Sequence, residues 1–244
     1  MRIGKILLAT TVGIYGLNLS AAIATKTTTS ANISVASAYL IRGDTINKGP
    51  AVQPSLSITT GNGLTFGFWG NFNVEDENDS QNEGEFGEID VYVEYALPID
   101  SDLVGVSVGA IEYTYPGAYN EDLKTQSDRE IKLAASLNTF ANPSLTVYYA
   151  LEGAIEEDVY GEISVSETVF SKDDFEVGVA AIGGYIDPKV GEQGWRHGTL
   201  ALTTAYKTVS ASFNYIIETD DKVLDLQEDE DETFYVTVGT GFTF

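Results

Sequence analysis

Three acidic side chains in one short stretch are the first feature of this sequence that could do chemistry. Glu88, Asp90 and Glu94 stand in EIDVYVEY, separated by even numbers of residues. In an extended chain such residues point to one face, so a strand would present the three carboxyl groups together. Paired carboxylates can act as acid and base in a glycosidase or protease, whereas carboxylates lining a pore concentrate cations. What this face contacts decides between the two.

Nucleophilic catalysis has little support in the sequence. A hydrolase needs a nucleophile and a base within reach of each other. The single histidine, His197, lies in GWRHG within an expected loop, away from any serine-bearing strand. We therefore expect a solvated loop histidine. Because the chain has no cysteine, a transition-metal site also has few ligands. The sequence predicts no enzyme, no metal and no cofactor.

The elements that must position these residues are short alternating segments. Beyond the N-terminal region no helical periodicity extends over a dozen residues, and twelve runs of about ten residues alternate in polarity instead. Leu64, Phe66 and Phe68, for example, alternate with Thr65, Gly67 and Trp69. About ten residues is the length of a tilted strand that crosses a membrane. The runs lie near 32–42, 51–60, 63–73, 87–97, 103–115, 128–140, 144–152, 157–168, 173–186, 198–206, 208–218 and 233–244.

The connections between these runs alternate strictly between long and short. The long ones include RGDTINKGP and EDENDSQNEGEF, and the short ones include GNG, ANP and SKDD. An even number of strands with long loops at one end and tight turns at the other is typical of outer-membrane barrels, whereas a soluble sandwich has no reason to sort its loops. In lipid every backbone group must pair within the protein. We therefore predict an all-β transmembrane antiparallel up-and-down β-barrel of about 12 strands.

The last run, TFYVTVGTGFTF, would be an apolar edge strand if it stayed unpaired. Phe234, Phe242 and Phe244 share one face, and an exposed edge of this kind promotes aggregation. We expect this strand to pair with the first one, near Ile33 to Arg42, and to face lipid. Phe242 and Phe244 also resemble the C-terminal signal that barrel-assembly machinery reads, although an ordinary terminal strand would look the same.

The N-terminus has the organisation of a secretory signal peptide. Arg2 and Lys5 precede an apolar run from Ile6 to about Leu19, and Ala22-Ile23-Ala24 fits the A-x-A cleavage rule. We predict a cleaved signal peptide at 1–24 and the outer-membrane barrel at 25–244. The alternative, a retained helical anchor, is disfavoured because the apolar run is short and broken by threonines.

Composition excludes several classes of protein. A 244-residue chain with 43% hydrophobic residues and a mean hydropathy of −0.05 is neither disordered nor a helical membrane bundle. Without cysteine it has no disulfides. A net charge of −24 repels phosphate backbones, so nucleic acid is not an expected partner.

A family resemblance rests on three stretches of the first half of the mature chain. YLIRGDTINKGPAVQPSLSI is similar to the first strand and polar loop of proteobacterial porins labelled the TorF family. GFWGNF with EIDVYVEY, and GVSVGAIEYTYPG, fit the glycine-tryptophan segment, acidic strand and tyrosine-proline-glycine exit of that family. The second half matches only in pattern. The resemblance implies a small outer-membrane barrel proposed to be a channel, and brings no catalytic residue or substrate with it.

The inward faces of the predicted strands supply the candidate pore-lining residues. Their carboxylates could form a filter that favours cations, or basic residues could neutralise them as a salt-bridged plug; both alternatives stay open. Trp69 could form a constriction or stack on a ring-shaped solute, although a one-residue bulge would turn it outward. The candidates are Arg42, Trp69, Glu88, Asp90, Glu94, Glu130, Lys132, Glu152 and Glu162.

Two acidic loops hold oxygen ligands of the kind that calcium sites use. Neither EDENDSQNEGE nor DLQEDEDE matches the spaced pattern of an ordered calcium loop. One interpretation is weak contact with divalent cations that bridge lipopolysaccharide phosphates, and the other is a solvated acidic surface suited to high salt.

The leading functional hypothesis is a narrow passive channel, a porin for small hydrophilic solutes, cationic or neutral, in the outer membrane of a Gram-negative cell. Its partners would be outer-membrane lipid, lipopolysaccharide, the barrel-assembly machinery and the solutes. The first alternative is a non-conducting structural or recognition barrel with acidic surface loops, and the second is an exported β-sandwich that binds carbohydrate.

Overall fold

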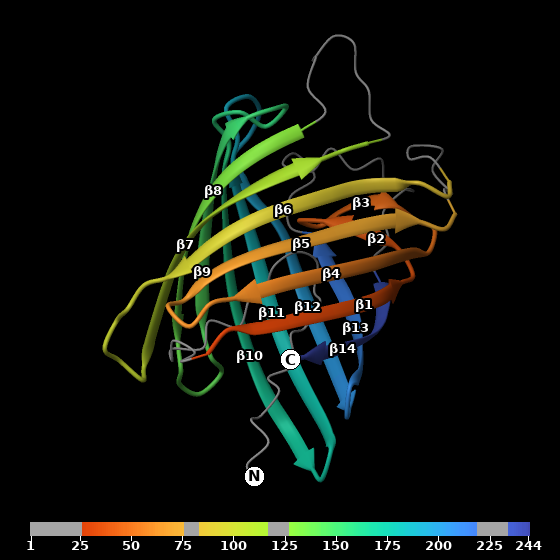
Figure 1. Ribbon diagram of the computed structural model, residues 1–244. Coiled ribbons are helices and arrows are strands. Elements are labelled where there is room, and N and C mark those ends of the chain that lie inside the picture. Colours follow the sequence, from red (N-terminus) through yellow and green to blue (C-terminus); the bar gives the residue numbers. More distant parts are fainter. Residues whose placement is uncertain (1–25, 76–82, 117–126, 219–233) are drawn as a thin grey trace.

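The computed structural model describes residues 26–75, 83–116, 127–218 and 234–244. Twelve antiparallel strands form one closed barrel, and two short strands form a separate hairpin (Figure 1). This closure confirms the predicted fold and excludes the β-sandwich. The barrel strands are β1 (Thr28–Ala36), β4 (Ala51–Thr59), β5 (Leu64–Asn73), β6 (Phe86–Ala96), β7 (Val104–Thr114), β8 (Ser127–Leu137), β9 (Ser144–Glu152), β10 (Val159–Lys172), β11 (Phe175–Asp187), β12 (Gly194–Tyr206), β13 (Val209–Glu218) and β14 (Phe234–Thr243).

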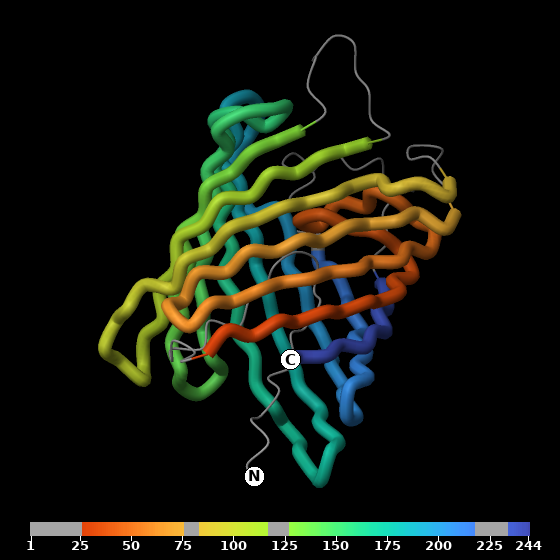
Figure 2. The backbone as a smooth tube through the Cα atoms, in the orientation of Figure 1, coloured from red at the N-terminus to blue at the C-terminus, as the bar shows by residue number. Residues whose placement is uncertain are grey.

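The two ends of the chain close the barrel. Residues Ser30 to Ala36 of β1 pair with Thr243 to Thr237 of β14, while β1 also pairs with β4 on its other side. Figure 2 shows the red and blue ends of the tube side by side. The predicted pairing of the last strand with the first is confirmed, and it leaves the barrel without a free edge strand at the terminus.

The wall separates apolar and polar side chains as a period of two requires. On β8, Ile131 and Leu133 are 44% and 52% exposed on the outside, while Asp128, Glu130 and Lys132, which share the other face, are buried. The same alternation repeats around the barrel, so an apolar band surrounds a polar interior. Among the described residues, no helix is long and apolar enough to cross a membrane.

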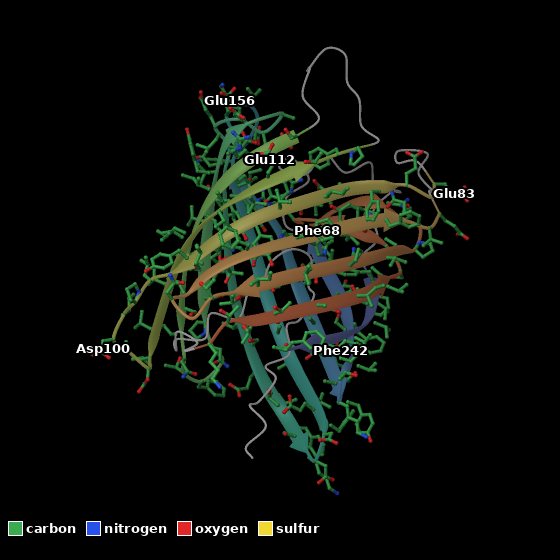
Figure 3. The ribbon with its side chains drawn as sticks, in the orientation of Figure 1. Phe68, Glu83, Asp100, Glu112, Glu156 and Phe242 are labelled. Atoms are coloured by element: carbon green, nitrogen blue, oxygen red, sulfur yellow. The ribbon has the colours of Figure 1, made fainter. Side chains whose placement is uncertain are left out.

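The two ends of the barrel differ as the loop lengths predict. Glu83 and Glu156 lie on long connections, whereas Asp100 lies on the short β6–β7 turn at the opposite end (Figure 3). The β10–β11 hairpin extends beyond the other short turns (Figure 1), because β10 pairs with β11 as far as Lys172 but with β9 only as far as Ser164. The predicted signal peptide at 1–24 lies outside the described residues.

The first strand is shorter than the sequence suggests. We expected it to run over 32–42, but β1 ends at Ala36, and the chain then forms the hairpin of β2 (Tyr39–Ile41) and β3 (Asp44–Asn47). The hairpin turn is Arg42-Gly43, with φ of 51° and 93°, and positive φ at both central residues is what a two-residue hairpin turn of type I′ needs.

The hairpin lies inside the barrel and not in its wall. Its Tyr39 ring lies 5.9 Å from the Trp69 ring of β5. On the other side, Leu40 belongs to a buried cluster with Ile216 of β13 and Tyr235 of β14. A segment that contacts β5 on one side and β13 and β14 on the other must fill part of the lumen between them.

Candidate functional site

Arg42 at the tip of the hairpin is the centre of the lumen site. Its Nη1 and Nη2 donate to Oε1 and Oε2 of Glu130 at 2.9 and 2.6 Å. Its guanidinium carbon lies 4.3 Å from the Tyr160 ring centre and 5.0 Å from that of Tyr148. A bidentate carboxylate and two aromatic faces satisfy a guanidinium well. Burial alone would lower the pKa of Arg42, but Glu130 outweighs it and raises that pKa above its ordinary value.

Further contacts hold the base of the hairpin. The Tyr39 hydroxyl donates to Oε2 of Glu88, and Arg196 of β12 forms an ion pair with Asp44. The Asn47 side chain donates to the backbone oxygen of Glu75 at 2.7 Å. Burial and the neighbouring Glu88 carboxylate raise the pKa of Tyr39, so its hydroxyl keeps the proton that it donates. The hairpin is therefore bonded to the wall at its base as well as at its tip.

A second ion pair spans β7 on the lumen side of the wall. Lys132 of β8 pairs with Glu94 of β6, and both side chains are buried. Glu130 stands two residues before Lys132 on the same face, where Tyr113 also donates to its Oε2 at 2.8 Å. Both predicted basic residues, Arg42 and Lys132, are thus paired with acids.

The structure brings eight of the nine candidate pore-lining residues into the lumen. Trp69 faces the hairpin, and Glu162 lines the same small cavity as Arg42 and His197. Acids outnumber bases among the described lumen residues, so the net field there is negative. The eight are Arg42, Trp69, Glu88, Asp90, Glu94, Glu130, Lys132 and Glu162.

Glu152 is the exception and corrects the sequence-based prediction. Its side chain is 65% exposed and pairs with Arg129 on the outer surface at 3.0 Å. In the pairing of β8 with β9, Arg129 stands opposite Glu152 and Glu130 opposite Ala150, so Leu151 has no partner position. An extra residue of this kind is a β-bulge, and it reverses the face of every residue beyond it.

His197 also corrects the prediction of a solvated loop histidine. It lies in β12 and is buried, with Nε2 2.9 Å from the Tyr160 hydroxyl and Nδ1 3.1 Å from Oγ1 of Thr199. Strand β12 begins at Gly194, and a register shift beside Tyr185 leaves Arg196 without a partner position. The alternation of His197, Thr199 and Ala201 was a signal that could have found it.

The described ranges contain no cluster of side chains that could bind a metal ion. There, no set of three or more histidine, aspartate or glutamate side chains is arranged to hold a metal ion. The acidic loops, for which weak divalent contact and a solvated surface were the two interpretations, lie mainly in 76–82 and 219–233, outside the described residues.

A family model described as "Bacterial protein of unknown function (Gcw_chp)" matches residues 20–242. The chain belongs to the Gcw_chp family. A search of curated proteins found no match. The match shows a bacterial family but does not show the TorF label, which stays a prediction for this Gcw_chp chain.

Solved outer-membrane barrels share the fold of this Gcw_chp protein. The NanC porin is 13% identical with a TM-score of 0.50, and the alignment covers 88% of this chain and 98% of that one. LpxR from Salmonella typhimurium is 10% identical with a TM-score of 0.48, over 88% and 100% of the chains. A loop L8 deletion mutant of OmpT from Vibrio cholerae is 11% identical with a TM-score of 0.40, over 90% and 98%. At these identities the likeness shows the fold alone.

The prediction that the protein is not an enzyme is wrong as a conclusion from the sequence. The barrel fold, which this chain shares with the NanC porin, excludes neither a channel nor an enzyme, because one fold can carry unrelated functions. The prediction also rested on a solvated His197, which is instead buried against Tyr160. Neither observation assigns an activity to this Gcw_chp chain.

Proposed function

We propose that this Gcw_chp protein is a narrow outer-membrane channel for small hydrophilic solutes, cationic or neutral, with the β2–β3 hairpin as its constriction. The observation that carries the proposal is a polar, acid-rich lumen that runs inside a barrel of twelve strands. Barrels of 16 or more strands leave wide aqueous channels, whereas smaller ones are filled by side chains or admit one small molecule. An inward-folded hairpin narrows this barrel further.

The charge in the lumen supports a preference for cations. Glu88, Asp90 and Glu162 add acidic groups beyond the two carboxylates that bind Arg42 and Lys132. Carboxylates in a confined aqueous path raise the local concentration of cations and repel anions. Neutral solutes small enough to pass the hairpin would be little affected by this field.

The proposed location is the outer membrane of a Gram-negative bacterium. The apolar outer band would contact lipid and lipopolysaccharide, and the predicted signal peptide would export the chain to the barrel-assembly machinery. Fractionation of cells that express the full chain tests this location. The assembled barrel should be found in the outer-membrane pellet, whereas protein that fails to assemble should be absent from it.

Planar-bilayer recordings of the purified protein test the channel. Protein that migrates as folded barrel without heating, and unfolds when boiled, should give discrete conductance steps that are small compared with those of wide porins. A folded preparation that gives no steps over repeated insertions would overturn the channel proposal.

One observation favours a second candidate, a non-conducting structural or recognition barrel. Arg42 of the hairpin and Lys132 of the wall are both paired with acids inside the lumen, as a salt-bridged plug would require. This candidate predicts a silent wild-type protein, and conductance only after residues 38–48 are replaced by a short glycine-serine linker. It also predicts that deleting the acidic loops abolishes function while the barrel persists.

A further inference from the structure

A cavity of about 190 Å³ lies between the hairpin and the wall at the long-loop end of the barrel. Its lining includes Glu88, Tyr113, Tyr115, Asp128 and Asp158. An engineered protein cavity of about 150 Å³ holds benzene, so this one has room for a ligand of roughly six to eight non-hydrogen atoms. A second cavity beside His197, of about 30 Å³, has room for little more than one water.

The two bases that line the larger cavity already have carboxylate partners. Arg42 is bonded to Glu130 through both terminal nitrogens, and Arg196 is paired with Asp44. An anionic ligand would therefore have to compete with built-in carboxylates. This argues against phosphate or a carboxylic acid as the occupant.

The other three carboxylates of the lining, Glu88, Asp128 and Asp158, accept hydrogen bonds from neutral donors and are not paired with a cation. Asp128 accepts from the backbone nitrogen of Ala154 at 2.6 Å and is hydrogen-bonded to Tyr115. Asp158 accepts from the backbone nitrogen of Lys189 at 2.7 Å. Burial, with the charge of Glu88 and Asp128, raises the pKa of Tyr115 above its ordinary value, so its hydroxyl stays neutral. The lining as a whole is negative.

Glu88 supplies the most specific sign of a ligand. The residue is 1% exposed, its Oε2 accepts from Tyr39, and its carboxyl group is also hydrogen-bonded to Asp90, but Oε1 itself has no hydrogen-bond partner among the described residues. Buried carboxylate oxygens are nearly always bonded, and an exception indicates a missing donor. On the same lining, Nε of Arg196 also lacks a partner there, which indicates a missing acceptor.

We propose that this cavity binds a small amino alcohol: a molecule with one primary ammonium group, which donates to Glu88, and a hydroxyl that can accept from Arg196. The aromatic rings of Tyr113 and Tyr115 are placed on the lining to contact an ammonium group or its methylene carbons. The inference deepens the proposed function, because it names a class of solute for the same lumen, but binding itself requires no conduction.

Titration of detergent-solubilised folded protein with 4-aminobutan-1-ol, followed by ligand-observed NMR, tests the site. Butane-1,4-diol has the same length without the charge and should bind at least tenfold more weakly. Glu88→Gln and Asp158→Asn should each weaken the amino alcohol at least tenfold. Glu112→Gln, which removes a carboxylate from the outer surface beside Arg129, should leave its affinity unchanged.

Two variants are needed because Glu88 also holds Tyr39 in place, whereas Asp158 lies outside the strands and binds only a backbone nitrogen among the contacts described. Equal binding of the diol and the amino alcohol, no saturable binding to folded wild type, or full affinity in both lining variants would overturn the site. Binding by a protein that is silent in bilayers would reject the channel and keep the site, whereas conduction without binding would do the reverse.

Discussion

Arg42 and Glu130 meet across the barrel lumen with both guanidinium nitrogens bonded to both carboxylate oxygens, at 2.9 and 2.6 Å. Glu130 is 1% exposed, and the two residues are 88 positions apart in the chain. A buried pair of this kind adds little net stability, because desolvation offsets the attraction, but losing one partner leaves a buried charge uncompensated. The pair therefore determines where the hairpin lies more than how stable the barrel is.

Arg42→Met should release the tip of the hairpin and destabilise the barrel. We expect the free energy of unfolding to fall by about 3–5 kcal/mol, because Glu130 stays buried without its cation, and the single-channel conductance to rise. Urea unfolding in lipid vesicles and bilayer recordings measure the two effects.

Two further variants separate the charge from the position of the hairpin. Arg42→Met combined with Glu130→Gln should recover most of the stability while the conductance stays high. Arg129→Met breaks only the exposed pairs with Glu112 and Glu152, so it should leave the free energy of unfolding nearly unchanged. Unchanged stability and conductance in Arg42→Met would mean that the pair does not hold the hairpin.

Gly43→Ala should displace the hairpin by steric contact. Gly43 has φ of 93°, and a Cβ atom there would lie 2.7 Å from Cβ of His197 on the barrel wall. We expect increased conductance from a barrel that still forms. Gly84→Ala is the matched control, because Gly84 has φ of 72° but a Cβ atom added there would meet nothing within 4 Å; it tests backbone strain alone. Equal conductance of the two variants would contradict the steric argument.

Replacing Glu88, Asp90 and Glu94 together by glutamine, asparagine and glutamine should reduce the cation preference of the channel. The change removes three carboxylates from the lumen face of β6 and leaves Lys132 without its acidic partner. The reversal potential under a salt gradient measures the preference, and the shift should be largest at low ionic strength, where screening is weakest. A reversal potential equal to that of wild type would reject the acidic filter. Glu112→Gln, which removes one carboxylate from the outer surface, is the control and should leave the reversal potential unchanged.

Phe242→Ala with Phe244→Ala should reduce the assembled fraction without preventing strand closure. Phe244 exchanges backbone hydrogen bonds with Thr29 at 3.1 and 2.9 Å, and these do not need the side chains. Both phenyl groups are exposed to the outside, so their loss should impair recognition by the assembly machinery several-fold. Heat-modifiable protein in outer-membrane pellets measures the fraction. Phe213→Ala, another outward residue, is the control, and an equal decrease there would contradict a specific signal.

The strands and their closure could be predicted from the sequence because their signals are local. Alternation at a period of two, turn residues and the order of long and short connections depend on neighbouring residues only. They placed Glu88, Asp90 and Glu94 on the lumen side of β6, and they paired the strand that ends at Phe244 with the first one. None of this required knowledge of distant contacts.

What only the tertiary structure decided depends on contacts between distant residues. One unpaired residue in β9 turned Glu152 outward, because a one-residue slip exchanges the two faces of a strand. The unpaired residue in β12 is Arg196, which lies beside His197 and pairs with Asp44 of the hairpin. The inward fold of the hairpin follows from the match of Arg42 to Glu130, Tyr148 and Tyr160, which lie on three different strands. A local pattern shows that Arg42 needs an acid, but only the closed barrel determines which acid lies within its reach.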